Sequence, residues 1–384
     1  MIYRGKGKFI FAIAALLLLL TACGGGGSSN NPPNPNPPNP TPVVSIGGSI
    51  TLAEELPGSV IIFTFTPSNT DIQWPSESEV SGSFTRTGNM VTWTLPAAVG
   101  TYTFTARATA DTAKSATVTA TVVANKKFDN LNAGATLVTA ANDVGVVVGL
   151  YEDSAGRQHA FVKNAGNRDY ENISPSNAVE AWAEGINRDG AIVGSFVDNA
   201  GRVRGFLRNP NGSYATIDVP GSDETWAYEI NDFGQVAGYF WDIAQDRYRG
   251  FIYNGGVYSF LDFSATAYTY AIGINNLEQV VGYYEDATGV HGFIKNGNNY
   301  TTVDYQNASS TELLAINDAG QIIGGFEDSF LDWYSFLKED GNYTAIDLPS
   351  AVETYATGIN NNGLIVGYYL DYNGDYYGFA QYGR

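Results

Sequence analysis

A unit of 42 to 45 residues is repeated through the last two thirds of this 384-residue chain, and it restricts the fold more than any other feature. An asparagine marks each unit: Asn142, Asn187, Asn231, Asn275, Asn317 and Asn360. A glycine follows each asparagine by seven residues, an aromatic residue by nine and an aspartate by eleven, without a slip. Repeats of this length are typical of solenoids and propellers, in which each unit buries its apolar face on its neighbours.

Each unit contains the pattern of four short strands. The first strand ends at the asparagine, and an Asn/Asp-x-Gly turn leads to the second. An Asp-x-x-Gly turn leads to the third strand, which ends in Gly-Phe or a close variant, and an outer strand follows. Four strands in this length match one propeller blade, so we expect an all-β fold with a six-bladed β-propeller over residues 125–384.

The two ends of the array indicate how it closes. The last unit stops after its third strand, while residues 127–131 have the pattern of an outer strand placed before the first unit. We therefore predict that residues 127–132 pair with residues near 376–382 and complete the last blade. An open solenoid is the alternative, and it would leave that strand unpaired.

The third strand of each unit carries the second signature. It reads His159-Ala160-Phe161 in the first unit and His291-Gly292-Phe293 in the fourth. These units resemble the HAF-type extracellular repeat of bacteria, over residues 128 to the C-terminus. Four units depart from it, with other residues in the histidine position: Arg204, Arg249, Tyr334 and Tyr377. The resemblance implies an extracellular location and a propeller-like array, and it supplies no established activity.

The N-terminus has the pattern of an export signal. Residues 1–22 hold Arg4, Lys6 and Lys8, followed by twelve apolar residues, and Cys23 comes directly after Ala22. Twelve residues span only about 18 Å as a helix, against about 30 Å for a bilayer core. The stretch resembles the bacterial lipoprotein lipobox, which implies cleavage before Cys23 and a lipid on its thiol. Gly24 in the next position implies the outer membrane if the sorting pattern of enteric bacteria applies.

Two further segments separate the lipid from the repeats. Residues 23–42 begin with Cys23 and continue as a Gly/Ser/Asn/Pro tether without a core-forming residue. Residues 43–124 alternate apolar and polar residues in short runs, which predicts half-buried strands and a small β-sandwich. Their last two strands resemble those of bacterial Ig-like and PKD-type domains, which usually act as spacers.

Composition narrows the class of partner. The formal net charge is −19, and it becomes −22 without residues 1–22. Such an acidic surface repels phosphate backbones, which argues against nucleic acid as a partner. We expect a monomer that meets the membrane only through its lipid.

Acidic and aromatic residues precede the asparagine of four units at the same spacing. They are Glu180 with Trp182, Glu224 with Trp226, Tyr268 with Tyr270, and Glu353 with Tyr355. We place them in the loops that enter each blade, where they would gather at the channel mouth and suit sugars or cationic groups. The alternative is that the rings pack between blades.

Other residues were considered for catalysis and metal binding. The two histidines, His159 and His291, occupy a position that other units fill with Arg or Tyr, which favours a strand-surface role. The repeated aspartates suit tight turns. Asp371, Asn373 and Asp375 have a spacing that could offer oxygens to calcium, without the remaining ligands of a calcium loop. We assign no catalytic residue and expect no cofactor beyond this calcium hypothesis.

These patterns favour a lipid-anchored outer-membrane protein, facing the periplasm or the surface, whose propeller binds an extracellular partner or glycan. One alternative is a glycan hydrolase or lyase that uses acids such as Glu180, Glu224 or Glu353. Another is a purely structural envelope protein.

Overall fold

The computed structural model describes residues 43–45, 49–55, 60–66, 72–96, 100–108, 115–122, 125–128, 134–164, 170–349 and 351–382. These residues form β-strands and one short 3-10 turn, η1 (Glu77–Glu79), so the predicted all-β class is confirmed. Over the same ranges, we find no helix with the length and apolar character needed to cross a membrane. Cys23 and the tether lie outside the described residues.

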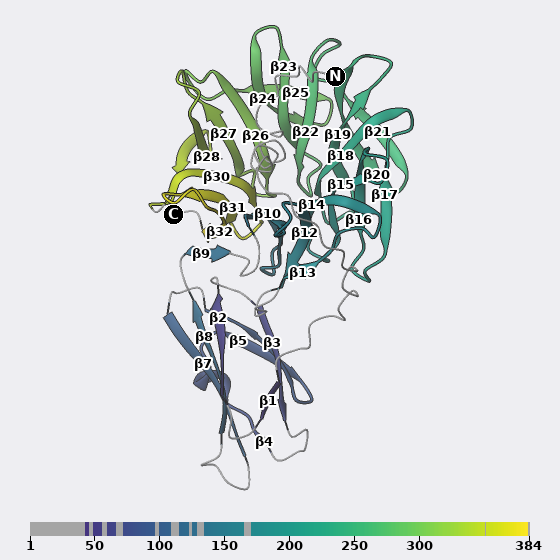
Figure 1. Ribbon diagram of the computed structural model, residues 1–384. Helices are drawn as coiled ribbons and strands as arrows, with labels where there is room; N and C mark the ends of the chain where they lie inside the picture. Colours follow the sequence, from purple (N-terminus) through teal and green to yellow (C-terminus); the bar gives the residue numbers. More distant parts are fainter. Residues whose placement is uncertain are drawn as a thin grey trace.

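The N-terminal strands form a β-sandwich (Figure 1). One sheet has the order β1-β3-β6-β5 and the other β2-β8-β7-β4. The bounds are β1 (Val43–Ser45), β2 (Ser49–Glu55), β3 (Val60–Thr66), β4 (Ile72–Gln73), β5 (Ser83–Thr87), β6 (Met90–Thr94), β7 (Gly100–Ala108) and β8 (Ser115–Val122). Aromatic rings from both sheets fill the core, where Phe63 and Phe104 meet edge to face with centroids 5.3 Å apart.

The repeats form a β-propeller, in which each repeat contributes strands in the order first, second, third and outer. The first strands are β10 (Thr136–Ala141), β14 (Ala178–Ile186), β18 (Ser222–Ile230), β22 (Tyr268–Ile274), β26 (Ser310–Ile316) and β30 (Ala351–Ile359). The second strands are β11 (Val147–Glu152), β15 (Ile192–Asp198), β19 (Val236–Asp242), β23 (Val280–Asp286), β27 (Ile322–Glu327) and β31 (Leu364–Asp371).

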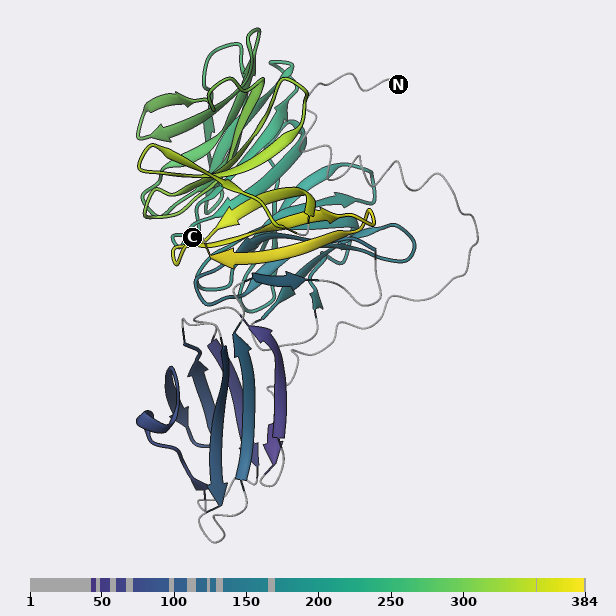
Figure 2. The ribbon, with the colours of Figure 1, turned by 90° about the vertical axis from the view of Figure 1, so that its left-hand side faces the viewer.

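The third strands are β12 (Gln158–Lys163), β16 (Val203–Arg208), β20 (Arg247–Asn254), β24 (Gly289–Asn296), β28 (Trp333–Glu339) and β32 (Tyr376–Tyr382). The outer strands are β13 (Glu171–Asn172), β17 (Tyr214–Ile217), β21 (Val257–Leu261), β25 (Asn299–Val303), β29 (Asn342–Ile346) and, from the N-terminal side, β9 (Asn125–Phe128). A single bridge between Val290 and Ser310 joins the fourth and fifth repeats into one sheet. Figure 2 shows the propeller and the sandwich from the side.

The first strands enclose a central channel. Each of them contacts the first strand of the next repeat, and β30 contacts β10. The strand β9 pairs antiparallel with β32, from Gly378 opposite Phe128 to Gln381 opposite Asn125. For Lys127 and Phe128 this is the pairing that we predicted; it begins two residues earlier, at Asn125, and residues 129–132 of the prediction lie outside the described residues. Phe128 is buried, so the start and the end of the repeat region share one core.

The repeated asparagines form a closed ring of hydrogen bonds. Each side-chain Nδ2 donates to the backbone carbonyl of the equivalent asparagine in the next repeat, over 2.8–3.2 Å. Asn360 donates to Asn142 and closes the ring across 218 residues of sequence. The Oδ1 atom of each accepts the backbone N–H four residues later. All six side chains are buried, and an unpaired buried amide would cost about 1–3 kcal/mol.

A β-bulge interrupts the pairing of first and second strands at the same place in every repeat. One residue of the first strand, three positions before the asparagine, has no partner opposite it. These residues are Thr139, Glu184, Tyr228, Ile272, Leu314 and Thr357. A bulge re-aims side chains and increases the local twist of the strand.

The repeated glycine of the second strand makes the bulge possible. A Cβ atom at this glycine would lie only 1.9–2.6 Å from a carbonyl oxygen of the first strand in all six repeats. The missing side chain also leaves room for the repeated phenylalanine, as for Phe251 beside Gly238. These six phenylalanines are at most 2% exposed. The glycine period in the sequence therefore reflects a close backbone approach inside each blade.

Replacing one of these glycines tests that account. We expect Gly238→Ala to lower the free energy of unfolding by on the order of 3 kcal/mol, because the methyl group would lie 2.1 Å from the Trp226 carbonyl oxygen. Gly250→Ala, on the neighbouring strand β20, is the control, since its Cβ would meet Ala271 and Leu261 at 3.2 Å. Urea unfolding of the two variants measures the difference, and equal losses would contradict the proposed role of the glycine.

Candidate functional site

A cavity of about 100 Å³ lies within the central channel. All six bulged residues line it, so the bulge directs one side chain from every repeat toward the channel axis. The other lining residues are Trp182, Trp226, Glu229, Glu312, Trp333, Tyr355, Ala356 and Tyr368. Among the described residues that line the cavity, there is no lysine, arginine or histidine.

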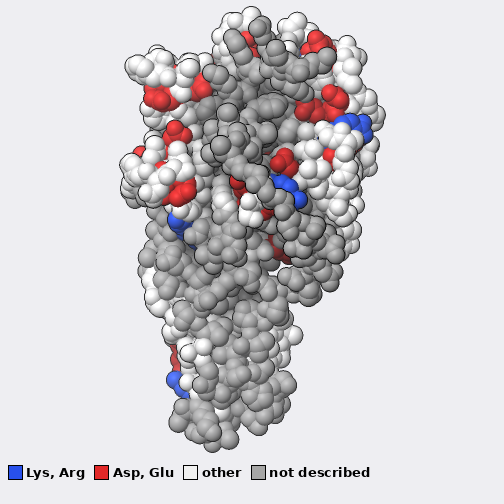
Figure 3. Space-filling model, viewed as in Figure 1, with Lys and Arg blue, Asp and Glu red and all other residues white. Residues whose placement is uncertain are grey.

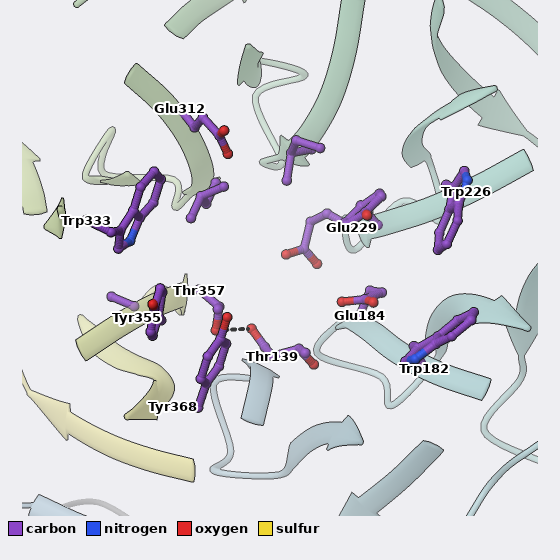
Figure 4. A pocket seen from close by; sticks show the side chains of 14 residues that line it. Thr139, Trp182, Glu184, Trp226, Glu229, Glu312, Trp333, Tyr355, Thr357 and Tyr368 are labelled. Carbon is purple, nitrogen blue, oxygen red and sulfur yellow. Dashed lines mark hydrogen bonds between the residues drawn. The ribbon is translucent and has the colours of Figure 1, made fainter. Parts of the chain in front are cut away.

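Three glutamates from three different strands border this cavity. Glu184 is the bulged residue of β14, Glu229 follows the bulged residue of β18, and Glu312 lies on β26. Their carboxyl groups point toward the open space in Figure 4. Gly185 makes room for Glu229, because a Cβ atom at position 185 would lie 2.8 Å from the Oε1 atom of Glu229.

The surroundings of these carboxyls disfavour their charged forms. Burial raises the pKa of Glu184 to about 8, and the nearby carboxyl of Glu229 adds to the effect. Burial also raises the pKa of Glu229 to about 8, although its Oε1 accepts a 3.0 Å hydrogen bond from the Ile230 N–H. Glu312 behaves alike, with its pKa raised to about 8 by burial and by the charge of Glu327. The carboxyls border the cavity, so a ligand there would reach them.

Aromatic rings make up most of the remaining wall. Trp182 and Trp226 pack against each other with centroids 5.6 Å apart, and Tyr355 stacks on Tyr368 at 4.9 Å. Trp226 and Tyr355 are only partly buried, so each keeps some surface free of protein contact. Burial raises the pKa of the Tyr368 hydroxyl, which therefore stays neutral at physiological pH. The site thus combines flat apolar faces with a few carboxyls.

The residues predicted from the sequence lie near the cavity, in a different element from the one expected. We expected them in the loops that enter the blades, and this was wrong: all eight belong to the first strands. These strands begin earlier than the pattern indicated, because additional irregular pairings extend β14, β18 and β30 toward their N-terminal ends. Of the eight, Trp182, Trp226 and Tyr355 line the cavity.

The other five predicted residues have protein partners or lie aside. Glu224 accepts hydrogen bonds from Trp226 Nε1 at 3.0 Å and from the Tyr248 hydroxyl at 2.6 Å. Glu353 accepts one from the Tyr355 hydroxyl. The remaining three are half-buried Glu180, Tyr268 beside Trp241, and Tyr270, which packs between Tyr239 and Tyr283. The alternative of packing between blades therefore describes Tyr270, and also Trp182, which is buried between Trp226 of the next repeat and Gln158 of the preceding one.

The repeated aspartates serve the turns. Asp371 Oδ1 accepts backbone N–H groups from Asn373 at 2.8 Å and Asp375 at 3.0 Å, and equivalent bonds occur in the other repeats. The hydrogen bond from Asp375 is the main cause that lowers the pKa of Asp371. Over the described residues, no cluster of three or more acidic, histidine or cysteine side chains could hold a metal ion. Calcium binding at this turn stays a hypothesis.

The histidines lie on strand surfaces outside the cavity. His159 Nε2 lies 2.9 Å from Asp153 Oδ2 in a hydrogen bond. Burial opposes ionisation of Asp153, but this hydrogen bond and those from backbone N–H groups outweigh it and lower the pKa of Asp153 to about 2. His291 contacts Asp304 through Nδ1 at 3.0 Å and the Thr288 hydroxyl through Nε2 at 2.9 Å. Neither of them is among the residues that line the cavity.

Sequence reasoning missed the three cavity glutamates. Glu312 occupies the position five before its asparagine, which the predicted aromatic residues Trp182, Trp226 and Tyr355 fill in other repeats. Comparing that position across all repeats could have found it. The bulged position gives no such signal, because Thr139, Glu184 and Ile272 share no chemical character.

A scan against protein-family models and a search of curated proteins found no match. Among solved structures, the chain is similar to TolB from Acinetobacter baumannii, with 9% identity, TM-score 0.46, 62% of this chain covered and 63% of that one. It is also similar to the propeller domain of the Trilobed protease from Pyrococcus furiosus, with 10% identity, TM-score 0.43, 66% of this chain covered and 97% of that one. A third similar structure is the Aleuria aurantia lectin with α-methyl-L-fucoside, with 12% identity, TM-score 0.41, 66% of this chain covered and 93% of that one. This chain thus spans less than two thirds of the TolB chain. At these identities, none of these proteins indicates what this chain binds.

The raised pKa of Glu312 gives a prediction for stability. A carboxyl whose pKa is higher in the folded than in the unfolded state binds its proton on folding, so its contribution is complete below about 4.5 and is lost as the pH rises to about 8. We expect Glu312→Gln to flatten this fall and to be more stable than the parent above pH 8, since a tenfold difference in proton affinity is worth about 1.4 kcal/mol.

Chemical denaturation at pH 5 and pH 8.5 measures this effect. Asp223→Asn is the matched control, because Asp223 is an exposed acid on the propeller strand β18. Parallel stability curves for the parent and Glu312→Gln would show that the carboxyl ionises freely in the folded protein.

Proposed function

We propose that this protein is a lipid-anchored binding protein of the cell envelope, whose six-bladed propeller binds an extracellular partner or glycan in the cavity of its channel. The observation that carries the proposal is the convergence of three carboxyls and several aromatic rings on one cavity of about 100 Å³. Ligand sites are concave, mostly apolar, and equipped with a few polar groups that fix orientation.

The chemistry of the wall supports a glycan or a similarly hydroxyl-rich ligand. Aromatic faces such as that of Trp226 can cover the C–H face of a sugar ring, and carboxyls can bond its hydroxyls. The acidic surface of the propeller, seen on one face in Figure 3, disfavours anionic partners.

The remainder of the proposal rests on the sequence. The lipobox-like segment before Cys23 supports a lipid anchor in the outer membrane, and the Gly/Pro-rich residues 24–42 support a tether. The Gly-Phe signature supports membership of the HAF-type repeats, and the sandwich would act as an Ig-like spacer.

A glycan hydrolase or lyase is the second candidate. The pKa values of about 8 for Glu184 and Glu229 favour it, because a carboxylic acid that is protonated at neutral pH can serve as a general acid. Of the acids considered from sequence, Glu224 and Glu353 are held by tryptophan or tyrosine partners, which suits them less to proton transfer.

A glycan-array and pull-down screen tests the binding function. We expect a ligand whose affinity falls at least tenfold, about 1.4 kcal/mol, in Trp226→Ala and Trp182→Ala, because both rings line the cavity. Trp74→Ala, in the sandwich, is the control that should leave binding unchanged. Turnover of a polysaccharide that is lost in Glu184→Gln would favour the enzyme, and neither binding nor turnover would favour a structural role.

The anchor has a separate test. In a bacterial host, we expect Cys23→Ser to abolish incorporation of labelled fatty acid and to move the protein out of the membrane fraction, because the thiol that carries the lipid is gone. A variant that stays lipid-labelled in the membrane fraction would contradict the lipobox interpretation.

A further inference from the structure

Among the described residues, the cavity wall carries three carboxyls and no basic side chain that would neutralise them when they ionise. Glu184, Glu229 and Glu312 border it, and the described lining residues include no basic side chain. Arg188 lines the neighbouring end of the channel together with Glu229, while Arg204, Arg247 and Arg249 are bound to aspartates of the blades. Within the cavity, the ligand would have to supply any positive charge.

Glu312 is the strongest indication that a ligand belongs there. The residue is 8% exposed, it lines the cavity, and its carboxyl group has no hydrogen bond to any of the residues that the structure describes. Burial of a carboxyl without a partner is costly, and natural proteins avoid it unless the group serves a site. Within the described part of the chain, the Glu184 carboxyl likewise has no hydrogen-bonded partner, so two acids border the cavity with unused bonding capacity.

Aromatic faces lie beside these acids. Glu312 pairs across the sheet with Gly325, and the indole of Trp333 lies where a Cβ of Gly325 would otherwise be. On the opposite wall, Tyr228 and Trp226 neighbour Glu229 on the same strand. A carboxylate beside the face of an indole or phenol ring is the combination that binds organic cations, since the ring face attracts positive charge.

Size and spacing select among cations. The glutamates do not come together closely enough for a metal ion, because no such group occurs among the described residues. At the roughly 30 Å³ that a water occupies in the liquid, a cavity of about 100 Å³ holds about three waters, enough for an ammonium group with a few carbons. A carboxyl of the wall can accept N–H groups from such an ammonium group.

We propose that this cavity binds the primary ammonium group of a small ligand, either an amino sugar or a short aliphatic diamine, through the carboxyls that border it, those of Glu184, Glu229 and Glu312. The proposal rests on the binding function above and names the chemistry that the ligand must have. A site for an ammonium group needs ionised carboxyls, whereas a site for a neutral sugar does not.

Protonation of the glutamates makes the two cases distinguishable. The other titratable groups around them are Glu180, Glu224, Glu285, Glu327, Glu353, Tyr228, Tyr239, Tyr270, Tyr283, Tyr355 and Tyr368. At the neighbouring end of the channel, Asp143, Arg188, Asp232 and Asp318 line a pocket together with Glu229. Burial raises the pKa of each of these tyrosines, so they do not ionise below pH 9. An ammonium ion binds the carboxylates and releases their protons, so its affinity rises with pH. A neutral sugar bonds the protonated acids, and its affinity falls.

Calorimetry on the purified full chain tests this with two matched pairs. The first pair is glucosamine and glucose at pH 7, and the second is 1,4-diaminobutane and 1,4-butanediol. We expect at least one amine to bind tenfold or more tightly than its neutral counterpart. Binding of the sugar amine or of the diamine alone would identify the source of the ammonium group.

A pH series on the diamine and two variants complete the test. Its affinity should rise between pH 6.5 and 8.5, by up to about tenfold per pH unit for each proton released. Glu312→Gln and Glu184→Gln should each weaken it at least tenfold, and Asp223→Asn should not change it. Tryptophan fluorescence can follow the same titration, since Trp182, Trp226 and Trp333 line the cavity.

The outcomes separate the two proposals. Equal binding of amines and neutral probes, or affinity that falls with pH, would overturn the ammonium site and leave glycan binding intact. A positive glycan screen without binding of either amine would also overturn the ammonium site and leave glycan binding intact. No binding of any probe and an empty glycan screen would overturn both.

Discussion

The propeller depends on a ring of six hydrogen bonds between buried asparagines, each donated to the backbone of the next repeat. The ring fixes the distance between neighbouring first strands and therefore the width of the channel. The asparagine Oδ1 atoms also hold the turns that follow, so one side chain organises both a turn and a contact between repeats. A residue without both a donor and an acceptor could not replace it.

The bulge just before each asparagine links this ring to the cavity. The bulge directs one residue of every first strand toward the axis of the channel. The repeated glycine of the second strand allows the bulge, because a side chain there would clash with the backbone of the first strand. The chemistry of the channel can therefore change from repeat to repeat while the scaffold stays constant. Threonine, isoleucine, leucine, tyrosine and glutamate all occupy the bulged position in this chain. Placing carboxyls there lowers stability at high pH, which is the usual consequence of shaping a site for a ligand.

The sequence predicted the scaffold better than the site. The fixed offsets of asparagine, glycine and phenylalanine predicted the repeating strands, the turns and the pairing of the N-terminal strand with the last repeat. The pattern could not predict the bulge, because period-two alternation assumes regular pairing and gives no information on where a strand gains a residue. Glu184 and Glu229 were missed for that reason. Trp182, Trp226 and Tyr355 were found, although we placed them in loops, since turn residues do not mark where the extended first strands begin.

The central claim is that the folded ring holds Glu184, Glu229 and Glu312 largely uncharged at neutral pH, ready to ionise for a ligand. An NMR titration of the glutamate side-chain carboxyl carbons in the free protein measures this directly, with one Glu→Gln variant to assign each signal. The account predicts three carboxyls that titrate well above the ordinary range, near the pKa of about 8. Three carboxyls that titrate near 4.5, like those on the surface, would contradict it.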